Sequence, residues 1–206
     1  MAANYSDQEQ VDKIKDWLKT NGPGIIAGVV LGLIAIGGWQ WWQARTQAQA
    51  EAASGYYNAM LENISVGDTN QVRQYATELT DEFDNTYYAV LAALLVARLD
   101  IEAGEQDAAI SQLQWALAQT KDEALQSVIR LRLARVLLAE QQLDQASAQL
   151  ARVTASQFAA ERAELQGDVY LAREQIDQAR RAYETALSTG GSQQLRWKIN
   201  SLPDNP

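Results

Sequence analysis

The sequence predicts an all-α protein in which a single membrane-spanning helix precedes a solenoid of helical hairpins. Three observations predict this fold class. The 206 residues are rich in Ala, Leu, Gln and Glu, and the three prolines lie at positions 23, 203 and 206, near the two ends. No charged residue occurs between Lys19 and Arg45. Beyond that stretch, one sequence phrase recurs at intervals of 37 and then 33 residues.

The composition excludes several classes of function. The chain has no Cys and no His, which removes disulfides, thiolate or imidazole catalysis and nearly all zinc or haem ligation. Its net charge is −9, with acids and bases interspersed, whereas nucleic-acid binding needs a basic face. The acidic clusters at 81–84 and 122–123 are typical of solvated turns and helix starts. We therefore expect a protein that is not an enzyme, carries no cofactor or metal and binds no nucleic acid.

Residues 1–21 are expected to form a short amphipathic tail. Val11, Ile14, Trp17 and Leu18 fall on one helical stripe. The run Asn21-Gly22-Pro23 then predicts that this helix stops before the apolar stretch begins.

Residues 22–44 are expected to cross a membrane. The 25 uncharged positions from 20 to 44 would span a hydrocarbon core of about 30 Å at a rise of about 1.5 Å per residue. Trp39, Trp41 and Trp42 at one end and Trp17 near the other resemble an interfacial aromatic belt. The alternatives are a buried helix of a soluble protein and a signal peptide. The 21 residues before the apolar run favour a retained anchor over a cleaved signal peptide, which would release a soluble exported protein.

The basic residues around this anchor predict its orientation. Lys13, Lys15 and Lys19 precede it, whereas the 25 residues that follow it carry only Arg45. By the positive-inside rule, the N-terminus stays in the cytosol and residues 45–206 are exported. The sequence thus predicts a single-pass membrane protein whose C-terminal domain is exported.

Glycines recur at every fourth position of the anchor. Gly24, Gly28 and Gly32 share one helical face, which lets a second membrane helix approach closely. Glycine is also common in membrane helices without such a contact. We expect a helix–helix contact here, with either a copy of this chain or another membrane protein as the partner.

The exported region repeats itself. Residues 107–117 read DAAISQLQWAL, 144–153 read DQASAQLARV, and 177–187 read DQARRAYETAL, each preceded by a helical segment. Four classes of position recur with the same two spacings. They are Ala97, Ala134 and Gly167; Ala109, Ala146 and Ala179; Leu113, Leu150 and Tyr183; and Ala116, Val153 and Ala186. This is the tetratricopeptide pattern, a helix–turn–helix of about 34 residues.

The repeats predict the boundaries of the exported domain. We place the three repeats at about 87–118, 125–154 and 158–188, after a weaker helix pair at 48–83. A capping helix over 192–202 is expected to cover the end of the solenoid. Asp100 occupies a position where the pattern requires an apolar residue, which puts the packing of the first repeat in question.

Stacked tetratricopeptide pairs form a groove lined by the first helix of each repeat. A groove that mixes leucines with arginines suits an extended or helical polypeptide. Some of these leucines could equally be core between neighbouring repeats. The predicted groove residues are Leu91, Leu94, Arg98, Ile101, Val128, Leu131, Arg135, Leu138, Glu161, Asp168 and Leu171.

The whole chain resembles the YfgM family of ancillary subunits of the bacterial Sec translocon. The resembling segments are QVDKIKDWLKTNG, GVVLGLIAIGGWQWW, VIRLRLARVLLAEQQLDQA and LRWKINSL, in this order. The resemblance implies a membrane-anchored periplasmic tetratricopeptide-like domain with no catalytic residues. The implied partners are the SecYEG channel, a membrane-anchored periplasmic chaperone of the PpiD type and exported polypeptides. A contact of the cytosolic tail with a response regulator is also implied.

We therefore expect a non-catalytic protein-binding module that helps to pass exported polypeptides from the Sec translocon to periplasmic chaperones. The alternative is a structural scaffold for an envelope or division complex, in which the repeats hold a fixed partner and never contact substrates.

Overall fold

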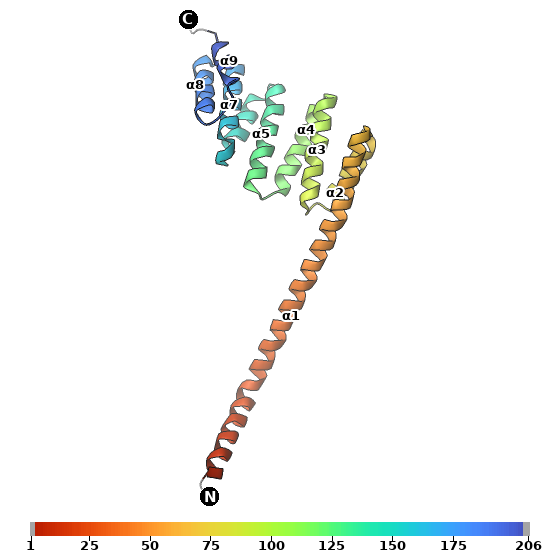
Figure 1. The fold of residues 1–206 in the computed structure, drawn as a ribbon, viewed down its shortest axis with the longest axis vertical. Coiled ribbons are helices and arrows are strands. Elements are labelled where there is room, and N and C mark those ends of the chain that lie inside the picture. The colour runs from red at the N-terminus through yellow and green to blue at the C-terminus, as the bar shows by residue number, and fades with distance from the viewer. Residues whose placement is uncertain (1–2, 204–206) are drawn as a thin grey trace. The chain divides into compact units, whose positions relative to one another are not determined.

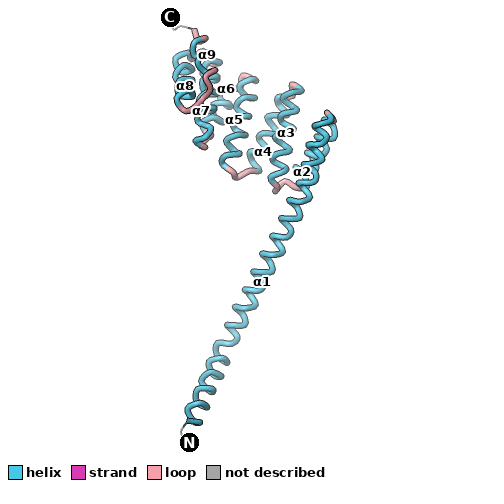
Figure 2. The backbone as a smooth tube through the Cα atoms, in the orientation of Figure 1, coloured by secondary structure: helices cyan, strands magenta, loops and turns pink. Residues whose placement is uncertain are grey.

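The computed structural model describes the backbone of residues 3–203 and the side chains from residue 11 onward. Within this range the chain forms α-helices and one short 3-10 helix, and it has no strand (Figures 1 and 2). Two compact units divide the chain at residues 49 and 50. The predicted all-α class is confirmed.

The first unit consists of the N-terminal part of α1 (Ala3–Val66). This helix is continuous through Pro23, so the predicted stop at Asn21-Gly22-Pro23 is wrong. Proline removes one backbone hydrogen bond from a helix, but side chains can support the adjoining turns. Here the Thr20 hydroxyl donates to the carbonyl of Asp16 at 2.9 Å, and the Asn21 amide donates to the carbonyl of Trp17 at 3.0 Å.

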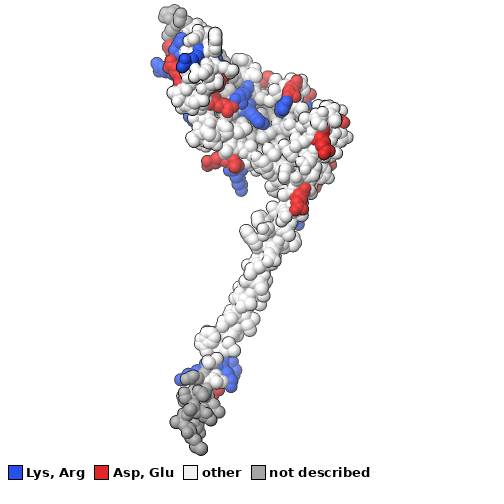
Figure 3. All heavy atoms as spheres, in the orientation of Figure 1, with Lys and Arg blue, Asp and Glu red and all other residues white. Residues whose placement is uncertain are grey.

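The apolar part of α1 is exposed along its length. Its best 18-residue window has a mean hydropathy of 1.8, and none of that window is buried within the chain. It is the one helix among the described residues that is long and apolar enough to cross a membrane. The buried core helix of a soluble protein is covered by other elements of its own chain, and this window is not covered by the described residues. Figure 3 shows a long stretch without charged side chains between the basic residues near the N-terminal end and the next charged ones.

The second unit is a succession of helices that pack on their neighbours in the chain. Its helical hairpins follow one another from α2 to α9, and the first helices α5 and α7 also contact each other (Figure 1). After residues 50–66 of α1, the elements are α2 (Thr69–Glu82), α3 (Tyr87–Ala103), α4 (Gln106–Gln119), α5 (Glu123–Ala139), α6 (Leu143–Ala151), η1 (Ser156–Phe158), α7 (Ala159–Ala172), α8 (Ile176–Ser188) and α9 (Leu195–Asn200).

Polar caps set where several of these helices begin. The side chains of Asp68, Thr86 and Asp122 accept hydrogen bonds from the backbone of the first turn of α2, α3 and α5, respectively. Such a cap satisfies one of the four backbone N–H groups that a helix start leaves without a partner. The strongest is the 2.7 Å bond from the backbone N–H of Leu125 to Asp122.

Every member of the four recurring position classes is buried. The structure adds a fourth copy that the sequence reading did not align, 37 residues before the first. Its members are Met60, Val72, Ala76 and Leu79, all of them 5 % exposed or less. In this copy the usual sizes are exchanged, because a large Met occupies the small first-helix position and a small Ala occupies the large second-helix position. The summed volume of these two positions is about the same as that of Ala97 and Leu113, in keeping with the volume rule for a close-packed core.

All four repeats turn between their two helices in the same way. Gly67, Gly104, Gln141 and Glu174 are each in the left-handed conformation, with φ from 57° to 78°. The backbone N–H that follows each of them donates to a carbonyl five residues earlier, at 2.8–3.0 Å. This is the Schellman ending, in which glycine is preferred because a Cβ is strained at positive φ. The last two repeats therefore hold strained side chains where the first two have glycine.

We predict that Gln141→Gly and Glu174→Gly will each stabilise the repeat domain by about 0.5–1 kcal/mol, because glycine relieves the cost of a Cβ in the left-handed region. The measurement is the urea midpoint of the full chain, followed by circular dichroism. Gly104→Ala is the matched control, and it is expected to shift the midpoint in the opposite direction. If all three variants had the same urea midpoint, the side chains of Gln141 and Glu174 would not be strained by their left-handed backbone.

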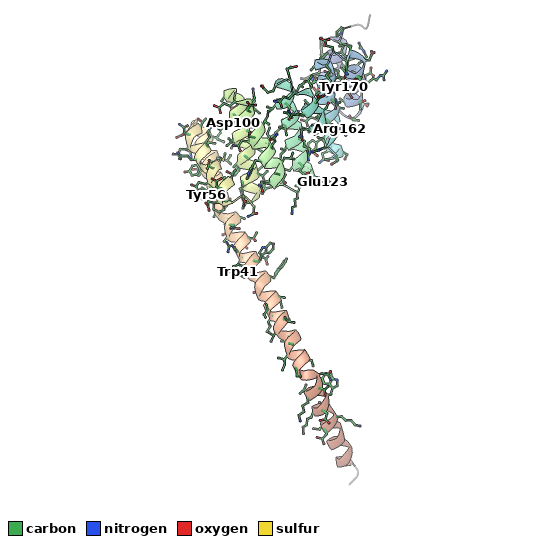
Figure 4. All side chains as sticks on the ribbon, turned by 180° about the vertical axis from the view of Figure 1, so that it is seen from behind. Trp41, Tyr56, Asp100, Glu123, Arg162 and Tyr170 are labelled. Carbon is green, nitrogen blue, oxygen red and sulfur yellow. The ribbon has the colours of Figure 1, made fainter. Side chains whose placement is uncertain are left out.

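Asp100 is fully buried between α2 and α3 (Figure 4). Arg73 of α2 reaches it, with 2.5 Å between Nη1 and a carboxylate oxygen, and also lies 3.5 Å from Glu105. Neither carboxylate oxygen has an aligned hydrogen bond among the described residues, so the ion pair with Arg73 compensates the buried charge. In the next repeat, Ile110 and Leu137 occupy the equivalent positions in the apolar core. Asp100 thus replaces an apolar residue of the repeat pattern, and Arg73, which replaces a second apolar residue, compensates its charge.

Candidate protein-binding surface

The tryptophans at the end of the apolar segment project outward from α1, as the sticks around Trp41 show (Figure 4). Trp39 and Trp42 contact each other with 5.5 Å between their ring centroids. The guanidinium of Arg45 lies 5.7 Å from the centroid of the Trp41 ring, within the range of a cation–π interaction. An aromatic cluster next to the first basic residue suits the boundary between hydrocarbon and headgroups.

Among the described residues, no side chain packs beside the glycines of the anchor. A Cβ added at Gly24, Gly28 or Gly32 would meet nothing within 4 Å. Glycine costs a helix about 1 kcal/mol relative to alanine in water. Nothing inside this chain requires glycine at these three positions.

The predicted groove residues separate into three groups in the structure. Leu94 and Leu131 are 6 % and 1 % exposed and belong to the central core cluster, so they are core residues and leave the candidate surface. A second group consists of charged residues that are paired within the chain. The third group is apolar and at least partly accessible, and it consists of Leu91, Ile101, Val128, Leu138 and Leu171.

The charged groove residues all have partners within the chain. Arg98 pairs with Glu102 one turn further along α3, at 2.8 Å. Arg135 of α5 pairs with Glu161 of α7, which links the first helices of two successive repeats. Exposed pairs of this kind contribute little stability, about 0–1 kcal/mol, but they neutralise the charge that the surface offers to a ligand.

Asp168, the fourth predicted charged residue of the groove, belongs to a network that holds the capping helix. Lys198 of α9 lies 2.7 and 2.9 Å from the two carboxylate oxygens of Asp168 and 3.0 Å from Glu164. The Tyr183 hydroxyl donates to the same carboxylate at 2.8 Å, and the Lys198 ammonium lies 5.4 Å from the centroid of the Tyr183 ring. Sequence reasoning missed this role of Asp168, because the contact joins residues 30 positions apart.

Burial and the hydrogen bond to Asp168 both raise the pKa of Tyr183. Burial alone would lower the pKa of Lys198, but its contacts with Asp168 and Glu164 outweigh burial and raise it. Both groups therefore hold their protons more tightly in the folded state than in the unfolded state.

We predict that this network will weaken in alkali. A group whose folded pKa is raised stabilises the fold below its unfolded pKa, about 10 for tyrosine, and loses that contribution as the pH rises further. Thermal unfolding by circular dichroism should therefore show a midpoint that this network leaves unchanged up to about pH 10 and that falls above it. Tyr183→Phe should cost about 1 kcal/mol at pH 7 and flatten this decline. If the midpoint of Tyr183→Phe fell with pH as steeply as that of the original chain, other titrating groups would be the cause of the fall.

Stacked helical hairpins with buried small–large pairs and one uniform turn define a tetratricopeptide-type binding scaffold attached to an anchor helix. Residues 15–204 match the tetratricopeptide repeat-like domain family. The chain is 31 % identical to the ancillary SecYEG translocon subunit of Haemophilus influenzae, over 98 % of this chain and all of the relative. It is 33 % identical to the protein of that name from Escherichia coli K12, over 96 % and 97 %, respectively. The chain belongs to this family, the YfgM family of ancillary SecYEG translocon subunits.

A solved structure shares the fold of the repeat domain. MamA from Desulfovibrio magneticus RS-1, from residue 41 to its end, superposes with a TM-score of 0.56 at 21 % identity. The match covers 67 % of this chain and 75 % of the MamA chain. At this level of identity the similarity concerns the fold alone.

Proposed function

We propose that the protein is a non-catalytic, membrane-anchored protein-binding subunit of the Sec translocon that helps to pass exported polypeptides to periplasmic chaperones. One observation carries this proposal: an exposed apolar helix and a tetratricopeptide-like domain occur in one chain that matches translocon subunits over nearly their full length. Protein binding is the function that a tetratricopeptide scaffold supports.

The proposal places the protein in the bacterial inner membrane as a single-pass protein. The N-terminus and the tail of residues 1–21 lie in the cytosol, residues 22–44 form the anchor, and residues 45–206 lie in the periplasm. Support for this orientation comes from Lys13, Lys15 and Lys19 on one side of the anchor and Arg45 alone on the other. The tail would be the part that is accessible to a cytosolic response regulator.

The partners follow from the two binding regions. We assign the face of Gly24, Gly28 and Gly32 to a contact with another membrane helix, because no contact inside the chain uses the space beside these glycines. That helix would belong to the SecYEG channel or to the anchor of a chaperone of the PpiD type. The accessible face of the first helices α3, α5 and α7 would receive the exported polypeptide.

We predict that Gly28→Leu and Gly32→Leu will weaken the complex with the partner helix at least about tenfold, because a large side chain prevents close approach. The measurement is co-purification of the channel from membranes in mild detergent. Ile26→Leu and Ile34→Leu, at exposed positions outside the glycine face, are the matched controls. Amide exchange in α3–α8 should stay unchanged in all four variants.

Photo-crosslinking in native membranes tests the function as a whole. A photoreactive residue at Gly28 should capture the channel or the membrane-anchored chaperone, and one at Val128 should capture nascent exported chains. The same group at the exposed Glu184 of α8 serves as the control and should capture neither. Capture of only copies of this chain, or of envelope enzymes without the channel, would favour a scaffold instead.

A further inference from the structure

Three arginines converge on the C-terminal end of α6. Arg130 of α5 donates a hydrogen bond to the side chain of Gln149 at 2.9 Å. Arg162 of α7 donates to the carbonyl of Val153 at 3.3 Å, one residue beyond Arg152 at the end of α6. No carboxylate of the described residues forms an ion pair with any of the three. We call Arg130, Arg152 and Arg162 the arginine cluster; Figure 4 labels Arg162.

The repeat pattern does not require basic residues at these positions. Counting from the left-handed turn residue of each repeat gives the equivalent positions in the other three repeats, and none of them is basic. The equivalents are Tyr56, Ala93 and Ala163 for Arg130; Glu78, Trp115 and Thr185 for Arg152; and Gly55, Ala92 and Ile129 for Arg162. The arginine cluster is therefore a property of the junction between α6 and α7, and the stacking of the repeats does not explain it.

The cluster holds more positive charge than the end of α6 can neutralise. The C-terminus of a helix is equivalent to about −0.5 elementary charge, which a single cation offsets. Burial and the positive charge of Arg152 both lower the pKa of Arg130, so the folded protein holds these charges together at a cost. An anion between the guanidinium groups would remove this repulsion.

The acids of the surrounding helices do not neutralise the cluster. Those at 122–123 begin α5 about 10 Å before Arg130 along the helix axis, and Lys121 precedes them. Glu184 of α8 has Arg181 one turn before it. Four further acids of α6 and α7 pair with other basic residues, in the pairs Asp144–Arg173, Glu161–Arg135, Glu164–Lys198 and Asp168–Lys198. The acids Glu140, Glu174 and Asp177 lie at the opposite, hairpin-turn ends of these helices. The end that carries the cluster thus keeps a net positive charge, whereas the whole chain carries −9.

A pocket of about 260 Å³ lies beside the cluster, between α6, α7 and α8. Arg162 lines it together with Gln166 and Thr185, which supply further polar groups. The other lining residues are Leu150, Ala151, Ala163 and Ala182, so the described part of the wall is apolar apart from these groups and contains no acid. Pockets for drug-sized ligands begin at about 300 Å³. This one has the size for a single side chain and not for a lipid acyl chain.

We propose that the arginine cluster and this pocket form a binding site for an acidic segment of a protein partner, with an apolar side chain next to its carboxylates. The guanidinium groups would hold the carboxylates in bidentate pairs, and the apolar side chain would enter the pocket. The site uses other residues than the first-helix face assigned to exported chains, and it does not depend on the proposed function. Positive charge on an acidic protein makes this junction selective for acidic partners.

The test measures the binding of fluorescein-labelled peptides by fluorescence anisotropy. The acidic peptide has four glutamates around a central leucine among Gly and Ser. A second peptide has glutamine in place of glutamate, and a third has serine in place of the leucine. The protein is the full chain in phosphatidylcholine nanodiscs, and empty nanodiscs give the baseline. We expect the acidic peptide to bind about tenfold more tightly than the glutamine peptide at low salt, and this preference should shrink at high salt.

Variants assign the preference to the cluster. Arg152→Gln/Arg162→Gln removes two exposed members and should weaken binding of the acidic peptide at least about tenfold. The matched control Arg132→Gln/Arg196→Gln removes two exposed arginines outside the cluster and should leave binding within about twofold. Ala182→Leu fills the pocket and should abolish the advantage of the leucine peptide over the serine peptide. Amide exchange in α5–α8 confirms that each variant is folded, and the single variants replace a double one that is not.

Each outcome decides for or against the site. Equal affinity for the acidic and glutamine peptides, or an equal loss in the control variant, overturns it. Binding of phosphatidylglycerol vesicles through Arg152 and Arg162, without binding of the acidic peptide, would identify a lipid headgroup as the ligand and also overturn it. If the crosslinks from Gly28 and Val128 fail while the peptide preference persists, the proposed function falls and the acidic-segment site stands.

Discussion

Arg73→Ala is expected to lower the local stability around α2 and α3 by about 3 kcal/mol. The change leaves Asp100, which is fully buried, without the cation that lies 2.5 Å from it. Breaking a buried pair from one side costs about 3–5 kcal/mol. We expect the lower end of this range, because the Arg73 side chain is 39 % exposed and water can reach its site. Hydrogen exchange of the full chain should show amides of α2 and α3 opening about 100-fold more often.

The following repeat supplies the compensating variant. Ile110 and Leu137 occupy there the positions that Arg73 and Asp100 occupy here, and both contribute to the core cluster. The double variant Arg73→Ile/Asp100→Leu should therefore recover most of the loss, to within about 1 kcal/mol of the original chain. If the double variant were as unstable as Arg73→Ala, the ion pair would not be the cause of the effect.

The solenoid provides an internal control for this experiment. Among the described residues the main helix–helix contacts join helices of the same or of adjacent repeats, so a change between α2 and α3 should leave exchange in α7 and α8 unaltered. Faster exchange throughout the domain would indicate that the repeats unfold as one unit, with the Arg73–Asp100 pair affecting all of them.

Most of the fold could be predicted from the sequence, because the repeats are visible in the spacing of residues along the chain. Ala109, Ala146 and Ala179 recur in register, and all three are fully buried. The fourth copy, which precedes the three predicted repeats, escaped this reading because Met60 and Ala76 exchange the sizes that the pattern expects. Only the packed structure shows that the two changes compensate, since the total volume is set by both residues together.

The surface was harder to predict than the core. The period of a helix assigns residues to a face, but it does not tell whether a partner from a distant part of the chain occupies them. Leu131 has the spacing of a groove residue and is buried by neighbouring repeats. Asp168 has that spacing too, and its carboxylate is taken by Lys198, which lies 30 residues further on. The sequence Asn21-Gly22-Pro23 was expected to end a helix, but α1 continues through Pro23.

Gly167→Ala is expected to destabilise the last repeat by about 3 kcal/mol. A Cβ at Gly167 would lie 2.4 Å from the Tyr183 ring, well inside van der Waals contact. The ring cannot move away freely, because Tyr183 is fully buried and its hydroxyl is bound to Asp168. Overpacking a core costs about 1–3 kcal/mol, and a rigid neighbour puts this case at the upper end. Urea unfolding of the full chain and exchange of α7 and α8 amides measure the loss.

A second substitution, Tyr183→Leu, should rescue Gly167→Ala, because the preceding repeat already combines an alanine with a leucine at these two positions. The repeat at 125–154 has Ala134 and Leu150 at the equivalent positions, both 1 % exposed. Tyr183→Leu alone removes the ring and the hydrogen bond to Asp168, so it should also destabilise. The double variant Gly167→Ala/Tyr183→Leu should be more stable than the sum of the two single losses predicts, by about 1–3 kcal/mol. If the two losses of stability simply add, the Cβ and the ring do not compete for the same space. The exchange of side-chain sizes between the first and second helix would then not govern the packing of this repeat.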